Sequence, residues 1–204
     1  MVKEALVVPR EVLFKEKSFE GFLLLEEYDY VSLIKEKHEY AVRGEELEHN
    51  AKLKQIIPYV LIIHPKTKRL FMYRRANNEK YSEVRLRNRW SCGVGGHIER
   101  EDDENPIRRA TMRELQEEVI MKKYPLPEIK GYVNSETGVE VYHFGIVSIA
   151  ETDEEEIGMG DGEIAEGKFM SLQEIEVLFS DSSNLFDKWT QLCIPFVKNY
   201  FRLV

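Results

Sequence analysis

The sequence is poor in cysteine, with only Cys92 and Cys193 among its 204 residues. Two cysteines this far apart do not indicate a disulfide framework, and without a C-x-x-C pair they do not indicate a zinc site. Unpaired thiols are typical of a reducing compartment. The scarcity of cysteine therefore favours a cytoplasmic protein.

Long apolar runs are also missing. No stretch approaches the roughly 18 consecutive apolar residues of a membrane-spanning helix. Residues 1–14, MVKEALVVPREVLF, lack the basic n-region and the apolar h-region of a signal peptide. Both absences predict a soluble protein that makes no contact with a membrane.

An excess of positive charge is missing as well. The 29 lysines and arginines are outnumbered by 37 aspartates and glutamates, so the net charge is −8 at pH 7. Nonspecific binding to nucleic acid depends on neutralising phosphates and is disfavoured by this balance. We therefore expect a small-molecule partner, with RNA 5′ ends as the one exception among nucleic acids.

At this length the chain can bury a substantial core.

What the sequence does contain is a cluster of carboxylates in residues 113–118, RELQEE. On a helix, offsets of three and four residues bring Glu114, Glu117 and Glu118 within roughly a third of the circumference. Like charges at this spacing destabilise a helix unless a cation neutralises them. Hard divalent cations such as Mg²⁺ take oxygen ligands of this kind. The spacing therefore indicates a metal site.

The residues upstream of this helix support a ligand site. A glycine turn, Gly93 to His97, follows an expected strand that ends at Trp90, and paired glycines let the backbone approach a ligand closely. Asn105 and Pro106 then supply an N-cap and a first helical residue. The alternative is an ordinary amphipathic helix, because Ile107, Thr111, Leu115 and Val119 form a core-facing stripe.

Together these residues resemble the Nudix box of the MutT-like hydrolases, whose pattern is G-x5-E-x7-R-E-U-x-E-E-x-G-U with U a bulky aliphatic residue. Residues 113–118 match its central half without a mismatch. The interval from Gly96 to Arg113 is three residues longer than the pattern, so Asp102, Asp103 and Glu104 compete for the place of its first glutamate. Ile120 replaces its late glycine.

The resemblance implies an α/β fold, namely an α/β/α sandwich around a mixed β-sheet with an N-terminal extension and a C-terminal helix. The corresponding domain limits are 1–54 for an extension packed on the core, 55–180 for the Nudix core and 181–204 for a C-terminal helical segment. The pattern of the remaining chain predicts strands at 2–8, 56–63, 70–74, 129–134 and 140–149, a loop at 158–162, and helices at 30–36, 172–179 and 185–203 with a kink at Pro195.

The chemistry that the resemblance implies is Mg²⁺-dependent hydrolysis of a diphosphate linkage in a nucleoside diphosphate joined to another moiety, with Mn²⁺ as a substitute ion. Glu114, Glu117, Glu118 and the Gly95 backbone would bind the metal. Glu117, Glu118, Glu163 and Arg113 would form the catalytic set, in which Arg113 positions the glutamates by a salt bridge.

A group of cations precedes the glycine turn and is a candidate for holding phosphate oxygens. Its members are Arg74, Arg75, Arg85 and Arg87, with Lys80 and Arg89 beside them. A solvated loop is the alternative for each arginine. The proton acceptor is also open: Glu163 is the first candidate, Glu166 its competitor and Asp161 a weaker one.

Three rival functions remain at this point. The first is a pyrophosphohydrolase of RNA 5′ ends, and the second is a noncatalytic ligand sensor. The third is an isoprenoid diphosphate isomerase, which Cys92, Gly96 and His97 keep open although no histidine-rich metal site is apparent in the sequence. We also expect a homodimer, because the N-terminal apolar residues would need a cover if they formed an exposed strand. These residues are Leu6, Val7, Val8 and Leu23 to Leu25.

Overall fold

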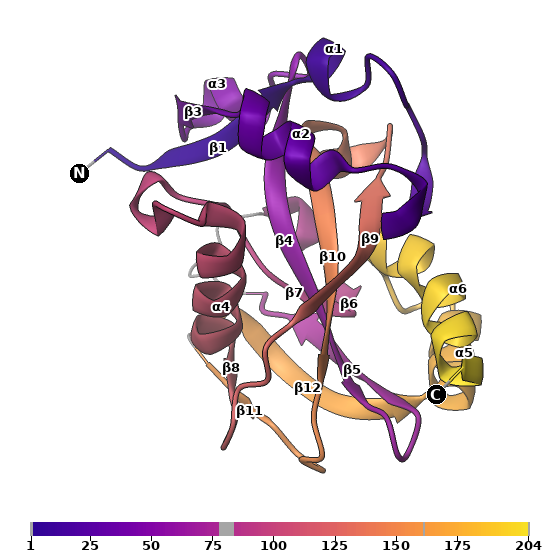
Figure 1. The fold of residues 1–204 in the computed structure, drawn as a ribbon. Helices are drawn as coiled ribbons and strands as arrows, with labels where there is room; N and C mark the ends of the chain where they lie inside the picture. Colours follow the sequence, from indigo (N-terminus) through magenta and orange to yellow (C-terminus); the bar gives the residue numbers. More distant parts are fainter. Residues whose placement is uncertain (1, 78–83, 161, 204) are drawn as a thin grey trace.

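The computed structural model describes residues 2–77, 84–160 and 162–203 (Figure 1). Lys80 and Asp161, both named above, lie outside the described residues. A large sheet runs through the middle of the molecule, and helices cover both of its faces.

Ten strands of the described residues form this sheet. The central order is β12-β5-β4-β10-β9-β2, with β1 and β7 paired to β4, β3 paired to β1 and β6 paired to β5. Their bounds are β1 Glu4–Pro9, β2 Gly21–Leu24, β3 Glu39–Val42, β4 Leu53–His64, β5 Arg69–Arg75, β6 Trp90–Ser91, β7 Gly93–Val94, β9 Glu128–Asn134, β10 His143–Glu151 and β12 Ile164–Ser171. A second sheet pairs β8 Val119–Ile120 with β11 Gly158–Met159.

The sheet is mixed because β4 and β10 are parallel while the other ladders are antiparallel. Strand β4 organises it: residues near its start pair with β1, and its last residues pair with β5 in the predicted hairpin. Side chains of β4 alternate between two cores, as a strand buried on both faces requires. Tyr59 and Leu61 pack on one side, and Val60 and Ile62 on the other.

The helices lie in two outer layers (Figure 1). On one face are α1, α2 and α4, and on the other are α5 and α6. This arrangement confirms the predicted α/β/α sandwich. The bounds are α1 Arg10–Leu13, α2 Tyr30–Lys37, α3 Glu45–Glu48, α4 Pro106–Glu118, α5 Leu172–Ser180 and α6 Lys188–Leu203, with short 3₁₀ turns η1 Leu25–Glu27, η2 Val84–Leu86, η3 Arg100–Asp102 and η4 Gly138–Tyr142. Within the described residues, no helix is both long and apolar enough to span a bilayer.

Helix α4 forms for the reasons read from its sequence. Pro106 occupies its first turn, and Asn105 stands at the N-cap position without a capping side-chain bond. The predicted stripe is buried, since Ile107, Thr111 and Leu115 are each at most 7% exposed. At about 100° per residue, Glu114 and Glu118 fall beside this stripe, whereas Glu117 lies toward the exposed side of α4.

The N-terminal segment belongs to the sheet, so its apolar residues do not form an exposed strand. Leu6 and Val8 pack in the core beneath α2, and Val7 packs against Leu47. The chain therefore covers these residues itself, and they give no reason to expect a second copy. Only Leu24 and Leu25 of the group remain partly exposed.

Several predicted limits differ from the structure. The strand near Trp90 begins there instead of ending, because Trp90 pairs with Arg74 and its N–H donates to the Leu185 carbonyl. Residues 138–142 form η4 before β10 starts at His143. Helix α6 begins at Lys188 and continues through Pro195. The expected loop at 158–162 starts with β11, which pairs with β8.

Candidate functional site

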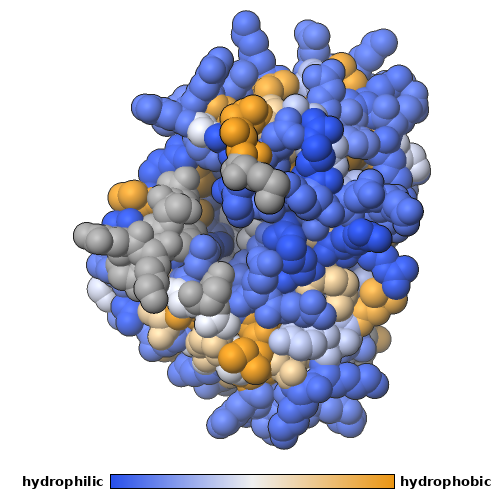
Figure 2. All heavy atoms as spheres, turned by 90° about the vertical axis from the view of Figure 1, so that its left-hand side faces the viewer, coloured by the Kyte–Doolittle hydropathy of each residue, from blue (hydrophilic) through white to orange (hydrophobic). Residues whose placement is uncertain are grey.

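A cleft of about 910 Å³ lies where the end of α4, the glycine turn, the N-terminal segment and the start of α6 meet. The side of the molecule that carries α4 and the N-terminal segment is mainly hydrophilic, with separated apolar spots (Figure 2). The cleft is lined by Lys3, Arg43, Gly44, Glu45, Glu48, Ile57, Tyr59, Arg75, Leu86, Gly95, His97, Glu99, Arg113, Glu114, Glu117, Glu118, Val139, Glu140, His143, Glu163, Asp187 and Trp189.

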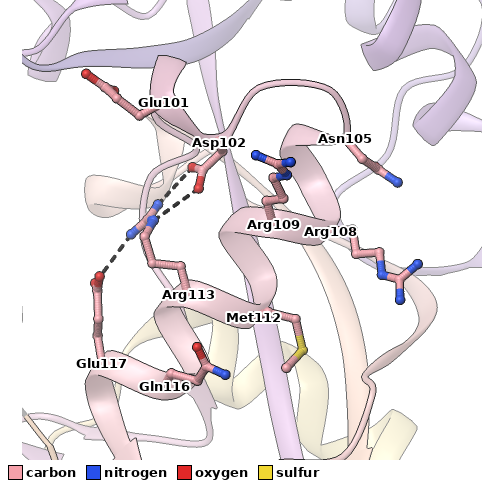
Figure 3. Close-up of a pocket in the computed structure, with 9 residues that line it drawn as sticks. All are labelled: Glu101, Asp102, Asn105, Arg108, Arg109, Met112, Arg113, Gln116 and Glu117. Atoms are coloured by element: carbon pink, nitrogen blue, oxygen red, sulfur yellow. Dashed lines mark hydrogen bonds and ion pairs between the residues drawn. The ribbon is translucent and has the colours of Figure 1, made fainter.

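Arg113 makes hydrogen bonds to several parts of this site. Its Nε and Nη2 donate to the two carboxylate oxygens of Asp102 at 3.1 and 2.9 Å, and Nη2 also donates to the His97 carbonyl at 2.9 Å. Its Nη1 reaches Glu114 at 2.5 Å and Glu117 at 3.3 Å. Figure 3 shows Asp102 and Glu117 held from opposite ends of the guanidinium. Arg113 thereby ties the glycine turn, the following loop and the carboxylate helix together.

The loop between the glycine turn and α4 folds so that Asp102 meets Arg113. It contains η3, and the Asp102 carboxylate also accepts the Glu99 N–H at 2.8 Å. Asp102 is buried, whereas the side chain of Glu104 is 85% exposed and lies 3.9 Å from Arg109. Asp103 adopts a positive φ of 39° and is exposed. Of the three competing acids, Asp102 is the one bonded to Arg113.

Glu118 is fully buried at the end of α4. Its Oε1 accepts the Gly95 N–H at 2.7 Å, while Oε2 has no hydrogen-bond partner in the described part of the chain. The pKa of Glu118 is raised to about 8, chiefly by burial and also by the charges of Glu114 and Glu163, against the opposing charge of Arg75. A Cβ on Gly95 would lie 1.8 Å from the Pro58 carbonyl oxygen. Position 95 therefore requires glycine for its N–H to reach the Glu118 carboxylate beside Pro58.

Glu114 lies directly against the glycine turn. A Cβ on Gly96 would come within 2.6 Å of its carboxylate, so only glycine leaves space for Glu114 here. Burial raises the pKa of Glu114 to about 7, and the nearby charges of Glu117 and Glu163 add to the shift while Arg113 opposes it. Both buried carboxylates thus gain from a cation that stabilises their ionised forms.

The donor set of the box fits a hard divalent cation. Glu114, Glu117 and Glu118 supply carboxylate oxygens, and the Glu118 Oε2 is a buried acceptor to which no described residue donates. The oxygens of the three do not gather within 4.8 Å of one another among the described residues. Arg113 binds both Glu114 and Glu117, and the Gly95 N–H binds Glu118. These bonds reduce the repulsion among the three carboxylates.

Glu163 and its competitor Glu166 point to different places. Glu163 lines the cleft, and its charge raises the pKa of both Glu114 and Glu118. Glu166 instead pairs with Arg74 at 2.6 Å and is half exposed. The loop before Glu163 is attached to α4, because the Gly160 N–H donates to the Glu118 carbonyl and a Cβ at Gly160 would lie 1.8 Å from the Glu117 carbonyl oxygen.

The four candidate arginines also lie in different surroundings. Arg75 lines the cleft beside Glu118. Arg74 faces away and binds Glu166 and Asn88. Arg85 lies 3.8 Å from Glu48 and over the ring of Tyr142. Arg87 is half-buried and is not among the described residues that line the cleft. The structure thus brings one of the four to the carboxylates.

The inner end of the cleft comes from the C-terminal segment, which sequence reasoning missed. Asp187 Oδ1 accepts the Thr190 N–H at 2.6 Å, and Thr190 Oγ1 accepts the Cys92 N–H at 3.0 Å. These bonds hold Asp187 and Trp189 in the cleft wall. Asp187 Oδ2 and Trp189 Nε1 are buried and have no hydrogen-bond partner among the described residues. The Trp189 ring meets Tyr59 edge-on at 5.3 Å between centroids.

The N-terminal segment supplies a second unexpected group. Glu48, at the end of α3, lies close to His97 and His143 in the cleft wall. Lys3 and Arg43 flank them, and both contact Glu99. No local sequence signal marks these residues, because they come from segments that the sheet alone brings together. His143, the first residue of β10, lies in the cleft wall.

A separate hollow of about 630 Å³ lies on the outer face of α4. Figure 3 shows the side chains of Arg108, Arg109, Met112 and Gln116 there, beyond Arg113 and Glu117. This hollow lacks the buried carboxylates Glu114 and Glu118, which line the large cleft. The chemistry therefore belongs to the large cleft.

Comparisons with known proteins agree with this geometry. The family model of the NUDIX domain matches residues 54–190. The structure of Tm1382, a candidate Nudix hydrolase, superposes with a TM-score of 0.73 at 23% identity, covering 97% of this chain and 99% of that chain. A search of the curated proteins gives no match.

Two further structures share the fold over part of this chain. The NUDIX domain of Shewanella oneidensis NrtR, complexed with ADP ribose, has a TM-score of 0.55 at 14% identity and covers 74% of this chain and 89% of that chain. The bifunctional NMN adenylyltransferase/ADP ribose pyrophosphatase of Francisella tularensis, complexed with AMP and a Mn ion, has a TM-score of 0.52 at 16% identity, covering 72% of this chain and 42% of that chain. With its family match spanning more than half of its length, and its box carboxylates on one helix, the chain belongs to the Nudix family.

Proposed function

We propose that the protein hydrolyses the diphosphate linkage of a nucleoside diphosphate joined to another moiety, using Mg²⁺ or, as a substitute, Mn²⁺. The observation that carries this proposal is the buried Glu118 Oε2, which has no hydrogen-bond partner among the described residues although buried polar atoms are nearly always paired. It lies in the cleft that also contains Glu114 and Glu163.

Glu114, Glu117, Glu118 and the Gly95 backbone would hold the metal. When bound, the ion would polarise phosphate oxygens and lower the pKa of a water molecule. Arg113 acts as a positioning residue, because its bonds to Asp102 and the His97 carbonyl orient the guanidinium that holds Glu114 and Glu117. It has no need to touch the substrate.

Glu163 is the proposed proton acceptor. It lines the cleft close enough to Glu114 and Glu118 to raise the pKa of both, and it is not itself one of the proposed metal ligands. A carboxylate that keeps its lone pairs away from the metal is the better base. Arg75 is the proposed phosphate ligand, since it lines the same part of the cleft.

The inner end of the cleft would take the part of the substrate beyond the diphosphate. Tyr59 and Trp189 offer aromatic surface, Trp189 Nε1 offers a donor, and Asp187 Oδ2 offers an acceptor. A planar group that carries both a donor and an acceptor, as nucleobases do, matches this set. Fold neighbours bound to ADP ribose and to AMP make ADP-ribose the first substrate to test.

A pyrophosphohydrolase of RNA 5′ ends remains the second candidate, since Leu86 lines the cleft and Arg85 lies 3.8 Å from Glu48 in its wall. A noncatalytic sensor is the third. The cytoplasmic location and the homodimer stay predictions, and the apolar strand that motivated the dimer is covered within the chain. Sedimentation at micromolar concentration tests the assembly.

A phosphate-release panel at saturating Mg²⁺ tests the function. It compares ADP-ribose, nucleotide sugars, dinucleoside polyphosphates, nucleoside triphosphates and triphosphorylated or capped RNA. We expect release from one nucleoside-diphosphate class that stops when EDTA is added. Binding without release from any substrate would favour the sensor, and release from RNA alone would favour the second candidate.

A further inference from the structure

Three segments far apart in the sequence meet in the wall of the cleft. Glu48 is the last residue of α3, His97 follows the glycine turn, and His143 is the first residue of β10. One ligand atom from each lies within 4.8 Å of the other two, and all three residues are half-buried. In the described part of the chain this is the one group of three such side chains so close together.

The two imidazoles are oriented toward this group. His143 Nδ1 lies 2.9 Å from the Val139 carbonyl and must donate to it, so the ring carries its lone pair on Nε2. His97 Nε2 lies 3.9 Å from Glu48 Oε1. The ring centroids are 5.6 Å apart. A backbone carbonyl that fixes the tautomer of a histidine is the usual outer partner of a metal-binding imidazole.

Gln55 completes the surroundings. It is the register partner of His143 on the adjacent parallel strand, and its Oε1 lies 2.8 Å from His97 Nε2. Its Nε2 is buried without a hydrogen-bond partner among the described residues. The amide is therefore held through one neutral hydrogen bond, which His97 can exchange for a stronger ligand. After this exchange, Gln55 Oε1 would be the nearest additional oxygen ligand for a bound ion.

We propose that Glu48, His97 and His143 bind one divalent transition-metal ion of the Zn²⁺ class, in a site separate from the carboxylates of α4. Two imidazole nitrogens and one carboxylate oxygen form a set that suits Zn²⁺ and related ions, whereas Mg²⁺ prefers oxygen alone. The three residues line the cleft, so a fourth position opens toward it. Three protein ligands with an open position are typical of zinc sites that bind a water or substrate oxygen.

The charges around the site are compatible with a cation. Lys3 and Arg43 are close, and Glu99, which contacts both, offsets one of their two positive charges, while Glu48 itself carries a further negative charge. Glu45, one turn before Glu48, also lines the cleft. The ion would link α3 of the N-terminal segment to the glycine turn and β10. This gives the N-terminal segment a role at the cleft that does not depend on the hydrolase activity.

The test uses Zn²⁺ alone as the probe and the histidine ring nitrogens as the readout. Nuclear magnetic resonance of ¹⁵N-labelled full-length protein, in excess Mg²⁺ to occupy the oxygen site, follows all five histidines. We expect one equivalent of Zn²⁺ to shift the ring signals of His97 and His143 and to leave those of His38, His49 and His64 unchanged.

The Glu48→Gln variant removes one ligand charge from a partly exposed side chain, so its fold should be intact. Its Zn²⁺ affinity should fall by at least about tenfold, while the matched Glu45→Gln variant keeps the affinity of the parent. His143→Asn, judged folded by circular dichroism, should also weaken binding. Zn²⁺ that leaves His97 and His143 unshifted, or that binds Glu48→Gln as tightly as the parent, would overturn the proposal.

Discussion

Arg113 and Asp102 are joined by two hydrogen bonds, from Nε to Oδ1 at 3.1 Å and from Nη2 to Oδ2 at 2.9 Å. Paired bonds of this kind between charged groups fix orientation as well as adding energy. The same guanidinium contacts Glu114 and Glu117. Asp102, which is 6% exposed, therefore orients the cation that holds two of the box carboxylates.

Asp102→Asn should lower the free energy of unfolding by about 1.5–3 kcal/mol, because a charged partner of a partly buried arginine is lost. Urea unfolding in metal-free buffer measures the change. Asp103→Asn is the matched control: Asp103 is exposed, and asparagine tolerates its positive φ. Equal stability of the two variants would contradict the role given to Asp102.

Glu117→Gln should lower turnover by about a hundredfold or more, since it removes a ligand charge from the proposed metal site. The metal-free variant should melt no lower than the parent. Its only described ion pair, with Arg113 at 3.3 Å, is half exposed and worth about 0.3–0.5 kcal/mol, while the substitution relieves repulsion from Glu114. Turnover and thermal melting are measured on the same preparation, and full activity would sink the assignment of the box.

The metal-free protein should lose stability as the pH rises. The pKa of Glu118 is raised from 4.5 to about 8 and that of Glu114 from 4.5 to about 7. Between the unfolded value of 4.5 and these raised values, the folded state binds more protons than the unfolded state. Their contribution is fully present below the unfolded pKa and is lost as the pH rises through the folded values. Urea unfolding in EDTA at about pH 6 and about pH 8.5 tests this.

Two controls sharpen the pH test. Glu118→Gln keeps the acceptor for the Gly95 N–H but cannot ionise, so its stability should fall less over the same interval. Saturating Mg²⁺ should weaken or reverse the loss, because metal binding favours the ionised carboxylates. Stability that is independent of pH in both proteins would contradict the raised pKa values.

Glu163→Gln should reduce turnover by roughly ten- to ten-thousandfold with little change in KM, as expected for loss of a general base. Glu166→Gln breaks an exposed ion pair with Arg74 and should leave turnover near that of the parent. The acidic limb of the pH–rate profile should change only in the first variant. An unchanged limb and a normal rate in Glu163→Gln would remove it from the mechanism.

Asp187→Asn replaces the unpartnered Oδ2 acceptor with a donor while retaining Oδ1 as the cap of Thr190. Trp189→Phe removes the Nε1 donor and keeps an aromatic ring beside Tyr59. Each should raise KM by about five- to a hundredfold with a smaller effect on kcat, because a buried polar contact to the substrate is lost or inverted. A KM that neither variant changes would exclude this end of the cleft from substrate binding.

The carboxylate helix could be predicted because its information is local. The spacing of Glu114, Glu117 and Glu118 and the apolar stripe of the same helix both follow from the helical repeat, and the hairpin of β4 and β5 follows from two apolar runs around a turn. The capping box of Ser171 and Glu174 is local for the same reason. In each case the interacting residues lie within a few positions of one another.

The sequence could not decide between neighbouring residues of the same type, whereas the fold does. Asp102, Asp103 and Glu104 fit the box pattern equally well, but the turn at η3 directs Asp102 toward Arg113. Likewise Glu163 and Glu166 lie near the start of β12, and the register with β5 brings Glu166 beside Arg74. Arg74 and Arg75 point to opposite sides because neighbouring residues of a strand alternate.

By itself, the sequence determined the family, the layered fold and the box helix, because these depend on local spacing and on apolar periodicity. Only the tertiary structure decided which distant side chains complete the cleft: Glu48 from α3, His143 from β10, and Asp187 and Trp189 from the start of α6. Pairing of β1 with β4 and of β4 with β10, together with the bonds from the C-terminal segment to Trp90 and Cys92, brings them together. Such long-range contacts depend on strand register and packing, which no short stretch of sequence encodes.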